Sequence, residues 1–158
     1  MATIKRKPNG YGRFGGFTPF GNSTSFVFTL LTNATGAVID SDTIAAVASG
    51  DVIDLGELPE GMRLDDANVF VTTAMTASVT GSLGFKYADG VDVAAVPQDA
   101  AYFISAGNIA SAGRLRANTG KLVTLPKAAR LILTTGGAAN AKVSDIKVIV
   151  NGELTGPR

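Results

Sequence analysis

The chain has 158 residues, a formal net charge of +1, and no cysteine, histidine or tryptophan. Its length suits a single domain that can bury a core without a metal or disulfide staple. The missing residue types exclude a cysteine nucleophile, a Ser-His-Asp triad, an imidazole base and thiolate-held metal sites, so the composition favours a structural or binding protein over an enzyme.

Residues 1–22 differ from the rest of the chain, and we expect them to form a flexible N-terminal arm. Glycines and prolines interrupt the segment and oppose regular structure. Its aromatic side chains recur about every third residue and need a partner to bury them, and its basic side chains have no acid beside them. We therefore expect partner contacts, as apolar anchors or pairing charges, from Lys5, Arg6, Lys7, Tyr11, Arg13, Phe14, Phe17 and Phe20.

From Ser25 onward the pattern changes to a period of two, which is typical of half-buried antiparallel strands. Apolar and polar side chains alternate most cleanly in Ser78–Tyr87, where Leu83, Phe85 and Tyr87 share one face. The same pattern predicts strands at 25–31, 68–75, 130–133 and 145–150, and shorter ones at 51–55 and 121–125.

Turn signals separate these segments, at residues 58–61, 88–90, 135–137 and in the pair Asn151-Gly152. Two short helices are also expected. Asp42 is positioned to cap a helix over 43–49, and Asp99 to cap one over 100–105.

Many short strands at this spacing predict an all-β fold, an antiparallel β-sandwich over residues 23–158, and among sandwiches we expect a jelly roll. The lack of a long apolar run predicts no membrane span, and the absence of a signal-peptide core predicts a soluble chain without a secretion signal. We expect no cofactor and no metal, because no acid pair fits a calcium loop. The arm has too few basic residues for us to expect a nucleic-acid partner.

Charge is distributed in blocks along the chain. Residues 1–20 carry +4, residues 40–99 hold eleven acids against two bases, and residues 100–158 hold eight bases against two acids. Opposite blocks attract, so they meet either between copies of the chain and on a larger surface, or within one folded monomer. The sequence leaves both alternatives open.

Two stretches of the chain resemble small head-decoration, or cement, proteins of bacteriophages. The first is Asp51-Val52-Ile53-Asp54-Leu55-Gly56-Glu57-Leu58-Pro59-Glu60-Gly61, followed by the Val/Thr-rich segment 67–74. The second runs from Lys121 to Leu131 and continues as Leu133-Thr134-Thr135-Gly136-Gly137. The similarity covers roughly residues 51–150 and does not include the arm.

The resemblance implies a non-catalytic virion protein at the capsid surface, produced in the host cytoplasm. Such a protein forms a homodimer or homotrimer and bridges neighbouring subunits of the major capsid protein. An alternative with the same architecture is a carbohydrate-binding or tail-fibre module, which needs an exposed aromatic platform. Fold alone does not choose between them.

Overall fold

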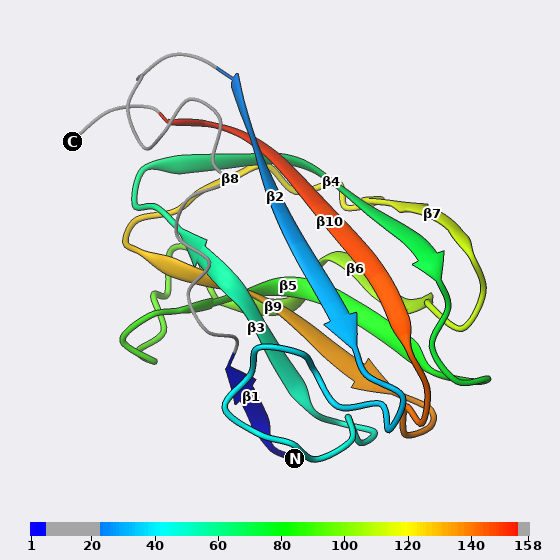
Figure 1. Ribbon diagram of the computed structural model, residues 1–158. Coiled ribbons are helices and arrows are strands. Elements are labelled where there is room, and N and C mark those ends of the chain that lie inside the picture. Colours follow the sequence, from blue (N-terminus) through cyan, green and yellow to red (C-terminus); the bar gives the residue numbers. More distant parts are fainter. Residues whose placement is uncertain (6–22, 155–158) are drawn as a thin grey trace.

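The computed structural model describes residues 1–5 and 23–154 (Figure 1). Strands, and no helix, make up the regular structure of this part of the chain. In chain order they are β1 (Thr3–Lys5), β2 (Ser23–Thr32), β3 (Val52–Leu58), β4 (Met62–Thr73), β5 (Thr80–Tyr87), β6 (Asp99–Asn108), β7 (Gly113–Arg116), β8 (Val123–Thr124), β9 (Ala129–Gly136) and β10 (Ser144–Leu154).

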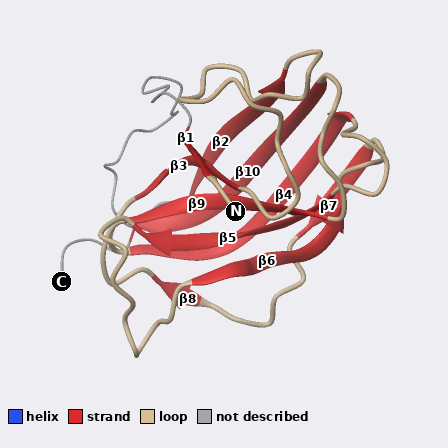
Figure 2. Cartoon of the chain, turned by 90° about the horizontal axis from the view of Figure 1, so that it is seen from below, coloured by secondary structure: helices blue, strands red, loops and turns tan. Residues whose placement is uncertain are grey.

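Two sheets pack face to face, which confirms the predicted β-sandwich (Figures 1 and 2). The first sheet has the order β1-β3-β9-β5-β6, and the second has the order β2-β10-β4-β7, with β8 also paired to β4. The pairs are antiparallel except β1 with β3, which is parallel. No helix in residues 1–5 and 23–154 is long and apolar enough to cross a membrane.

The alternating patterns predicted from the sequence place one side of each strand in the core between the sheets. In β2, Phe26, Phe28 and Leu30 are buried while Val27 is exposed. In β5 the predicted inward set, Leu83, Phe85 and Tyr87, is buried. Burying a large apolar side chain contributes about 1.5–3 kcal/mol to stability, so the inward faces of these two strands help to hold the sheets together.

The structure contradicts both predicted helices. Residues 43–49 form an irregular loop with one isolated bridge, from Ala46 to Ala37, and the Asp42 carboxylate accepts a hydrogen bond from the Lys5 amide (3.0 Å) rather than capping a helix. Residues 100–105 belong to β6. Asp99 Oδ1 does accept from the Ala101 amide (2.9 Å), as a cap would, but the chain continues as a strand against β5.

The predicted turn at Asn151-Gly152 is also wrong. Both residues lie inside β10, where the pairing with β4 shifts register between them. A Cβ on Gly152 would lie 2.3 Å from the Arg63 carbonyl oxygen. Glycine therefore allows β10 and β4 to approach closely at the bulge. The turn predicted at 58–61 is confirmed, because β3 ends at Leu58 and β4 begins at Met62.

The first residues of the expected arm form strand β1 at the edge of the first sheet. Ile4 is buried in the core, opposite Ile53 of β3. The carboxylate of buried Asp51 accepts from the Ala2 amide (2.9 Å) and so fastens the chain just before β1. The remainder of the expected arm, residues 6–22, lies outside the described residues, and β1 and β2 flank it in different sheets.

Candidate interaction surfaces

Acids of the 40–99 block and bases of the 100–158 block pair within the monomer. Among the described residues, four ion pairs join an acid of the first block to a base of the second: Asp54–Arg130 (3.0 Å), Asp66–Arg116 (3.2 Å), Asp89–Lys127 (2.7 Å) and Asp99–Lys121 (2.9 Å). Of the alternatives that the sequence left open, the structure therefore supports pairing inside one fold for these four acids. Three of the pairs are substantially exposed, so water and salt screen them and each contributes little to stability.

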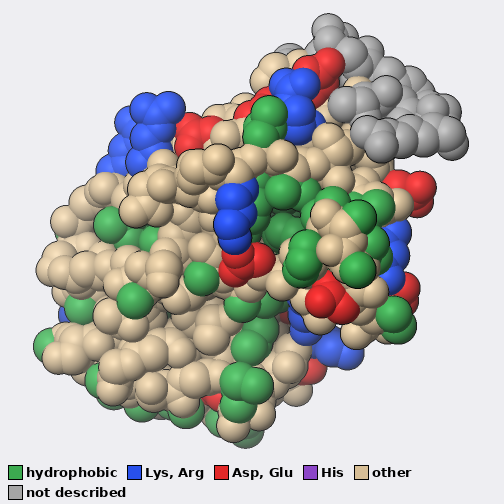
Figure 3. Space-filling view, turned by 180° about the vertical axis from the view of Figure 1, so that it is seen from behind, with side chains coloured by type: hydrophobic (Ala, Val, Ile, Leu, Met, Phe, Trp, Pro, Cys, Tyr) green, Lys and Arg blue, Asp and Glu red, His purple; other side chains and the backbone are tan. Residues whose placement is uncertain are grey.

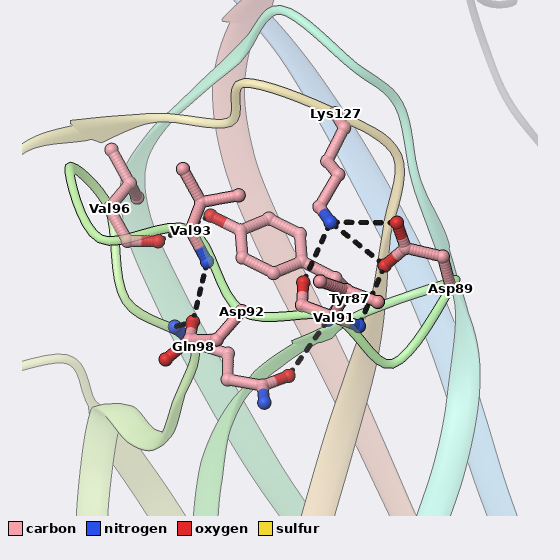
Figure 4. Close-up of polar contacts among 8 residues, drawn as sticks. All are labelled: Tyr87, Asp89, Val91, Asp92, Val93, Val96, Gln98 and Lys127. Carbon is pink, nitrogen blue, oxygen red and sulfur yellow. Dashed lines mark hydrogen bonds and ion pairs between the residues drawn. The ribbon is translucent and has the colours of Figure 1, made fainter.

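One of these bases, Lys127, holds the loop between β5 and β6, residues 88–98 (Figure 4). Its ammonium donates to both carboxylate oxygens of Asp89 (2.9 and 2.7 Å) and to the Val91 carbonyl (2.7 Å). The same ammonium lies 4.6 Å from the centre of the Tyr87 ring, a cation–π distance. Lys127 therefore ties the start of the loop to the end of β5.

The second half of the loop closes over the same tyrosine (Figure 4). The Tyr87 hydroxyl donates to the Val96 carbonyl, and Gln98 Oε1 accepts from the Tyr87 amide (3.3 Å). Asp92 Oδ1 accepts from the amides of Val93 and Gln98 (2.9 and 2.8 Å), which fixes the bend between them. Burial raises the pKa of the Tyr87 hydroxyl, which favours the protonated form that donates to Val96.

This loop presents apolar surface on an ordered support. Val91 is 62% exposed at its tip, although its amide and carbonyl are both bonded. The space-filling view from behind shows hydrophobic side chains gathered around a hollow on the right of the molecule, with few charged groups over the lower left (Figure 3). A fixed loop loses little conformational entropy on binding, so this end of the sandwich suits contact with another protein.

We expect Lys127→Met to raise the pKa of Asp89 and to loosen the 88–98 loop. The hydrogen bond from Lys127 is the main cause that lowers the pKa of Asp89 below its ordinary value, with the Val91 amide second. Because the folded pKa is lowered, the contribution of the pair is present above the ordinary aspartate pKa and is lost as pH falls through the folded value. NMR titration of the carboxyl carbons and amide exchange at Val91 measure both effects.

Lys121→Met is the matched control, because Lys121 is the main cause that lowers the pKa of Asp99. That variant should move the titration of Asp99 and leave Asp89 unchanged. An unchanged Asp89 titration in Lys127→Met would contradict the role given to Lys127.

A second exposed apolar area lies along strand β2 and the neighbouring residue Ile39. Val27 is 54%, Leu31 39% and Ile39 42% exposed. The Ile39 amide donates to the Leu31 carbonyl (2.8 Å), so these two side chains are neighbours. Toward the other edge of the second sheet the surface becomes polar, where the Arg114 guanidinium lies 5.1 Å from the centre of the Phe70 ring.

Buried polar side chains join the loops at the end of the sandwich opposite the 88–98 loop. The Asn140 amide donates to Thr32 Oγ1 (3.1 Å) and to the Lys142 carbonyl (2.9 Å), and its Oδ1 accepts from the Thr76 amide (3.1 Å). Thr32 Oγ1 also lies 2.8 Å from Ser144 Oγ. Asn140, Thr32 and Ser144 are at most 1% exposed, so every bond here replaces one to water.

Of the residues expected to contact a partner, the structure describes Lys5 alone, whose side chain is exposed on β1. The other seven lie outside the described residues: Arg6, Lys7, Tyr11, Arg13, Phe14, Phe17 and Phe20. Within residues 1–5 and 23–154, no group of three or more acidic side chains is placed to hold a metal ion.

The aromatic side chains in the described part offer no open platform for a sugar. Six are buried, namely Phe26, Phe28, Phe85, Tyr87, Tyr102 and Phe103. Phe70 is half-buried beneath Arg114. The carbohydrate-binding alternative therefore gains no support from these residues.

Sequence reasoning did not identify the Lys127 loop or the β2 surface as sites. Lys127 and Asp89 are 38 residues apart, and only the pairing of β5 with β9 brings them together. A usable signal was present at β2, because ten residues in a row, 23–32, carry no charge, proline or glycine.

Comparison with known proteins finds the same fold in phage capsids. No protein-family model matches the chain, and no curated protein matches it in sequence. A chain from the structure titled "Capsid of Ralstonia phage GP4" superposes with a TM-score of 0.69 at 17% identity, over 99% of both chains. A chain from "Cyanophage Pam1 capsid asymmetric unit" gives 0.59 at 16% identity, over 88% of this chain and 89% of the other. The chain thus shares its β-sandwich fold with proteins found in phage capsid structures.

Proposed function

We propose that this chain is a non-catalytic virion protein that decorates a phage capsid at its surface and bridges neighbouring subunits of the major capsid protein. The observation that carries the proposal is the fold likeness over 99% of both chains to a protein in a phage capsid structure. The absence of histidine and cysteine from the whole sequence agrees with a role that needs no bond chemistry.

We further infer that the sandwich is a jelly roll. Eight strands form two sets of four, with the orders β2-β10-β4-β7 and β3-β9-β5-β6. Successive strands cross from one set to the other, except β5 and β6, which form a hairpin. This double Greek-key order is the one used by many viral capsid domains, which supports a place in the virion.

Binding to the shell is proposed to use the aromatic residues of segment 6–22 and its basic residues. A variant with Tyr11, Phe14, Phe17 and Phe20 replaced by serine tests this. Deletion of residues 2–20 is a poorer test, because it removes buried Ile4 and strand β1. Loss of four apolar anchors is expected to weaken binding to purified phage heads at least about 100-fold, since single anchors contribute about 1–3 kcal/mol.

Co-sedimentation with heads that lack the protein measures this binding, and cryo-electron microscopy of the complex locates it. Ile44→Ser with Leu122→Ser is the control, because both side chains are exposed, at 95% and 67%, and neither lies in the 88–98 loop. Equal binding by the four-serine variant and the intact chain would overturn the role of segment 6–22. No binding by the intact chain would overturn the decoration proposal itself.

A further inference from the structure

We propose that strand β2 pairs with the same strand of a second copy of this chain, antiparallel and centred on Val27. In this arrangement the two second sheets continue across a twofold axis as one sheet. The inference goes beyond the proposed function: it names a surface for the homodimer that the resemblance implies, and it requires no shell.

The outer edge of β2 has backbone groups without a strand neighbour. The pairing with β10 runs from Ser23 to Thr32 without a register shift. The Leu31 carbonyl accepts from the Ile39 amide (2.8 Å), so the backbone groups of Leu31 point away from β10. Backbone N–H and C=O groups alternate in direction along an antiparallel strand, so those of Thr29 and Val27 point away from β10, as those of Leu31 do. Within the described chain these groups of Thr29 and Val27 have no backbone partner.

This edge also lacks the features by which proteins usually prevent strand addition. Short length, charged side chains, proline and bulges protect most edge strands. Strand β2 has ten residues with no charge, no proline and no register shift. Its composition is rich in β-branched and aromatic residues, which favours pairing.

The other edges of the described sheets each carry such protection. At one edge of the first sheet, β1 has three residues, with Lys5 exposed at its end. At the opposite edge, β6 pairs with β5 through two register shifts. In the second sheet, β7 has four residues, including Arg114 and Arg116, and β8 has two. Strand β2 is therefore the exception among the described edges.

A second copy fits this edge because β2 is complementary to itself. An uncharged strand meets no like charge when it pairs with its own copy, and a twofold axis makes each contact occur twice. When the twofold axis passes through Val27, Ser25 of one strand lies opposite Thr29 of the other. The backbone N–H and C=O groups of these residues, which point away from β10, can then bond to one another. A centre at Thr29 would need the Leu31 carbonyl, which the Ile39 amide already uses.

Side chains at the centre are suited to burial. Val27 is 54% exposed on the outer face of the second sheet, beside half-buried Ile149 on β10. Pairing would bring the two copies of Val27 together and cover apolar surface that the monomer leaves in water.

Cysteine cross-linking tests both the pairing and its register, because the chain has no cysteine of its own. Residues directly opposite in a hydrogen-bonded antiparallel pair have Cα atoms about 5.5 Å apart, within the range that a disulfide spans. Two copies of Val27→Cys should therefore link under oxidised glutathione. Two copies of Ser25→Cys would lie four residues out of register, about 14 Å apart, and should not.

Val91→Cys is the matched control, a valine of similar exposure in the 88–98 loop. We expect the Val27→Cys dimer to form at least tenfold faster than either other variant at equal protein concentration. Equal rates for all three would show random collision and overturn the proposal. Faster linking of Val91→Cys would place the contact at the loop and overturn it as well.

Sedimentation equilibrium gives an independent measure without cysteine. The intact chain should show concentration-dependent dimerisation that Val27→Lys abolishes and Val91→Lys retains, with equal melting temperatures at a concentration where all three are monomeric. A monomer at every concentration, together with no Val27→Cys linking, would overturn the pairing. Failure to bind phage heads would overturn the proposed function and leave these results unaffected.

Discussion

Gly36→Ala is expected to lower the free energy of unfolding by about 4 kcal/mol, since a left-handed alanine costs about 1–2 kcal/mol and a steric clash adds about 1–3. Gly36 has φ +83°, and a Cβ there would stand 2.1 Å from the Asn140 carbonyl oxygen. That oxygen belongs to backbone held between two loops, so it cannot move aside cheaply. Urea denaturation with an unchanged m-value measures the loss.

Gly50→Ala separates the two causes, because Gly50 lies in the same loop at φ +89° with nothing within 4 Å of a Cβ. It should cost only about 1 kcal/mol, the conformational part. Equal losses for the two variants would show that the close approach of Gly36 to Asn140 contributes nothing.

Asn140→Ala is expected to cost about 3 kcal/mol, because removal of a buried amide leaves its former partners without hydrogen bonds. The Thr76 amide and the Lys142 carbonyl each lose a bond to the side chain, at a position 1% exposed. The loops that carry Ile39 and Val143 should then exchange their amides faster, which hydrogen exchange measures residue by residue.

Asn108→Ala is the corresponding control. Asn108 is an exposed asparagine whose Oδ1 accepts from the Ala110 amide (3.0 Å). Its replacement should cost less than about 1 kcal/mol, as expected for a solvent-accessible hydrogen bond. A loss from Asn140→Ala no larger than this would mean that water replaces the missing amide.

The strands that the sequence predicted correctly are those with one face in the core. In β2 and β10 a single buried face produces strict alternation, and β5 and β9 depart from it only at buried Gly84 and Ile132, so the pattern is visible without knowledge of the neighbours. The sandwich as a class follows from these strands.

Strand β6 was missed for a physical reason. Its register shifts against β5 leave Tyr102, Phe103 and Ile104 all buried in succession, so alternation disappears. Asp99 followed by alanines then imitates a helix start. Strand β1 was missed because three residues give no period, and its pairing partner lies about fifty positions away, with Ile4 opposite Ile53.

The interaction surfaces were less predictable than the fold. In the alternating pattern of apolar and polar residues, an exposed valine such as Val27 cannot be distinguished from any other outward-facing residue. Only the order of the strands in the sheet shows that it lies at an edge. The internal pairing of the charge blocks likewise depends on which strands adjoin. The predicted contacts at segment 6–22 remain a prediction.

The place of β10 has a consequence for the order in which the chain can fold. Strand β10 lies between β2 and β4, so the second sheet cannot be completed until residues 144–154 leave the ribosome. Such distant pairings make folding slow. Until then neither edge of the uncharged strand β2 is paired with a neighbouring strand of its sheet, and unpaired strand edges promote aggregation. Chains released before residue 144 should therefore be cleared or aggregate rather than persist as partly folded monomers.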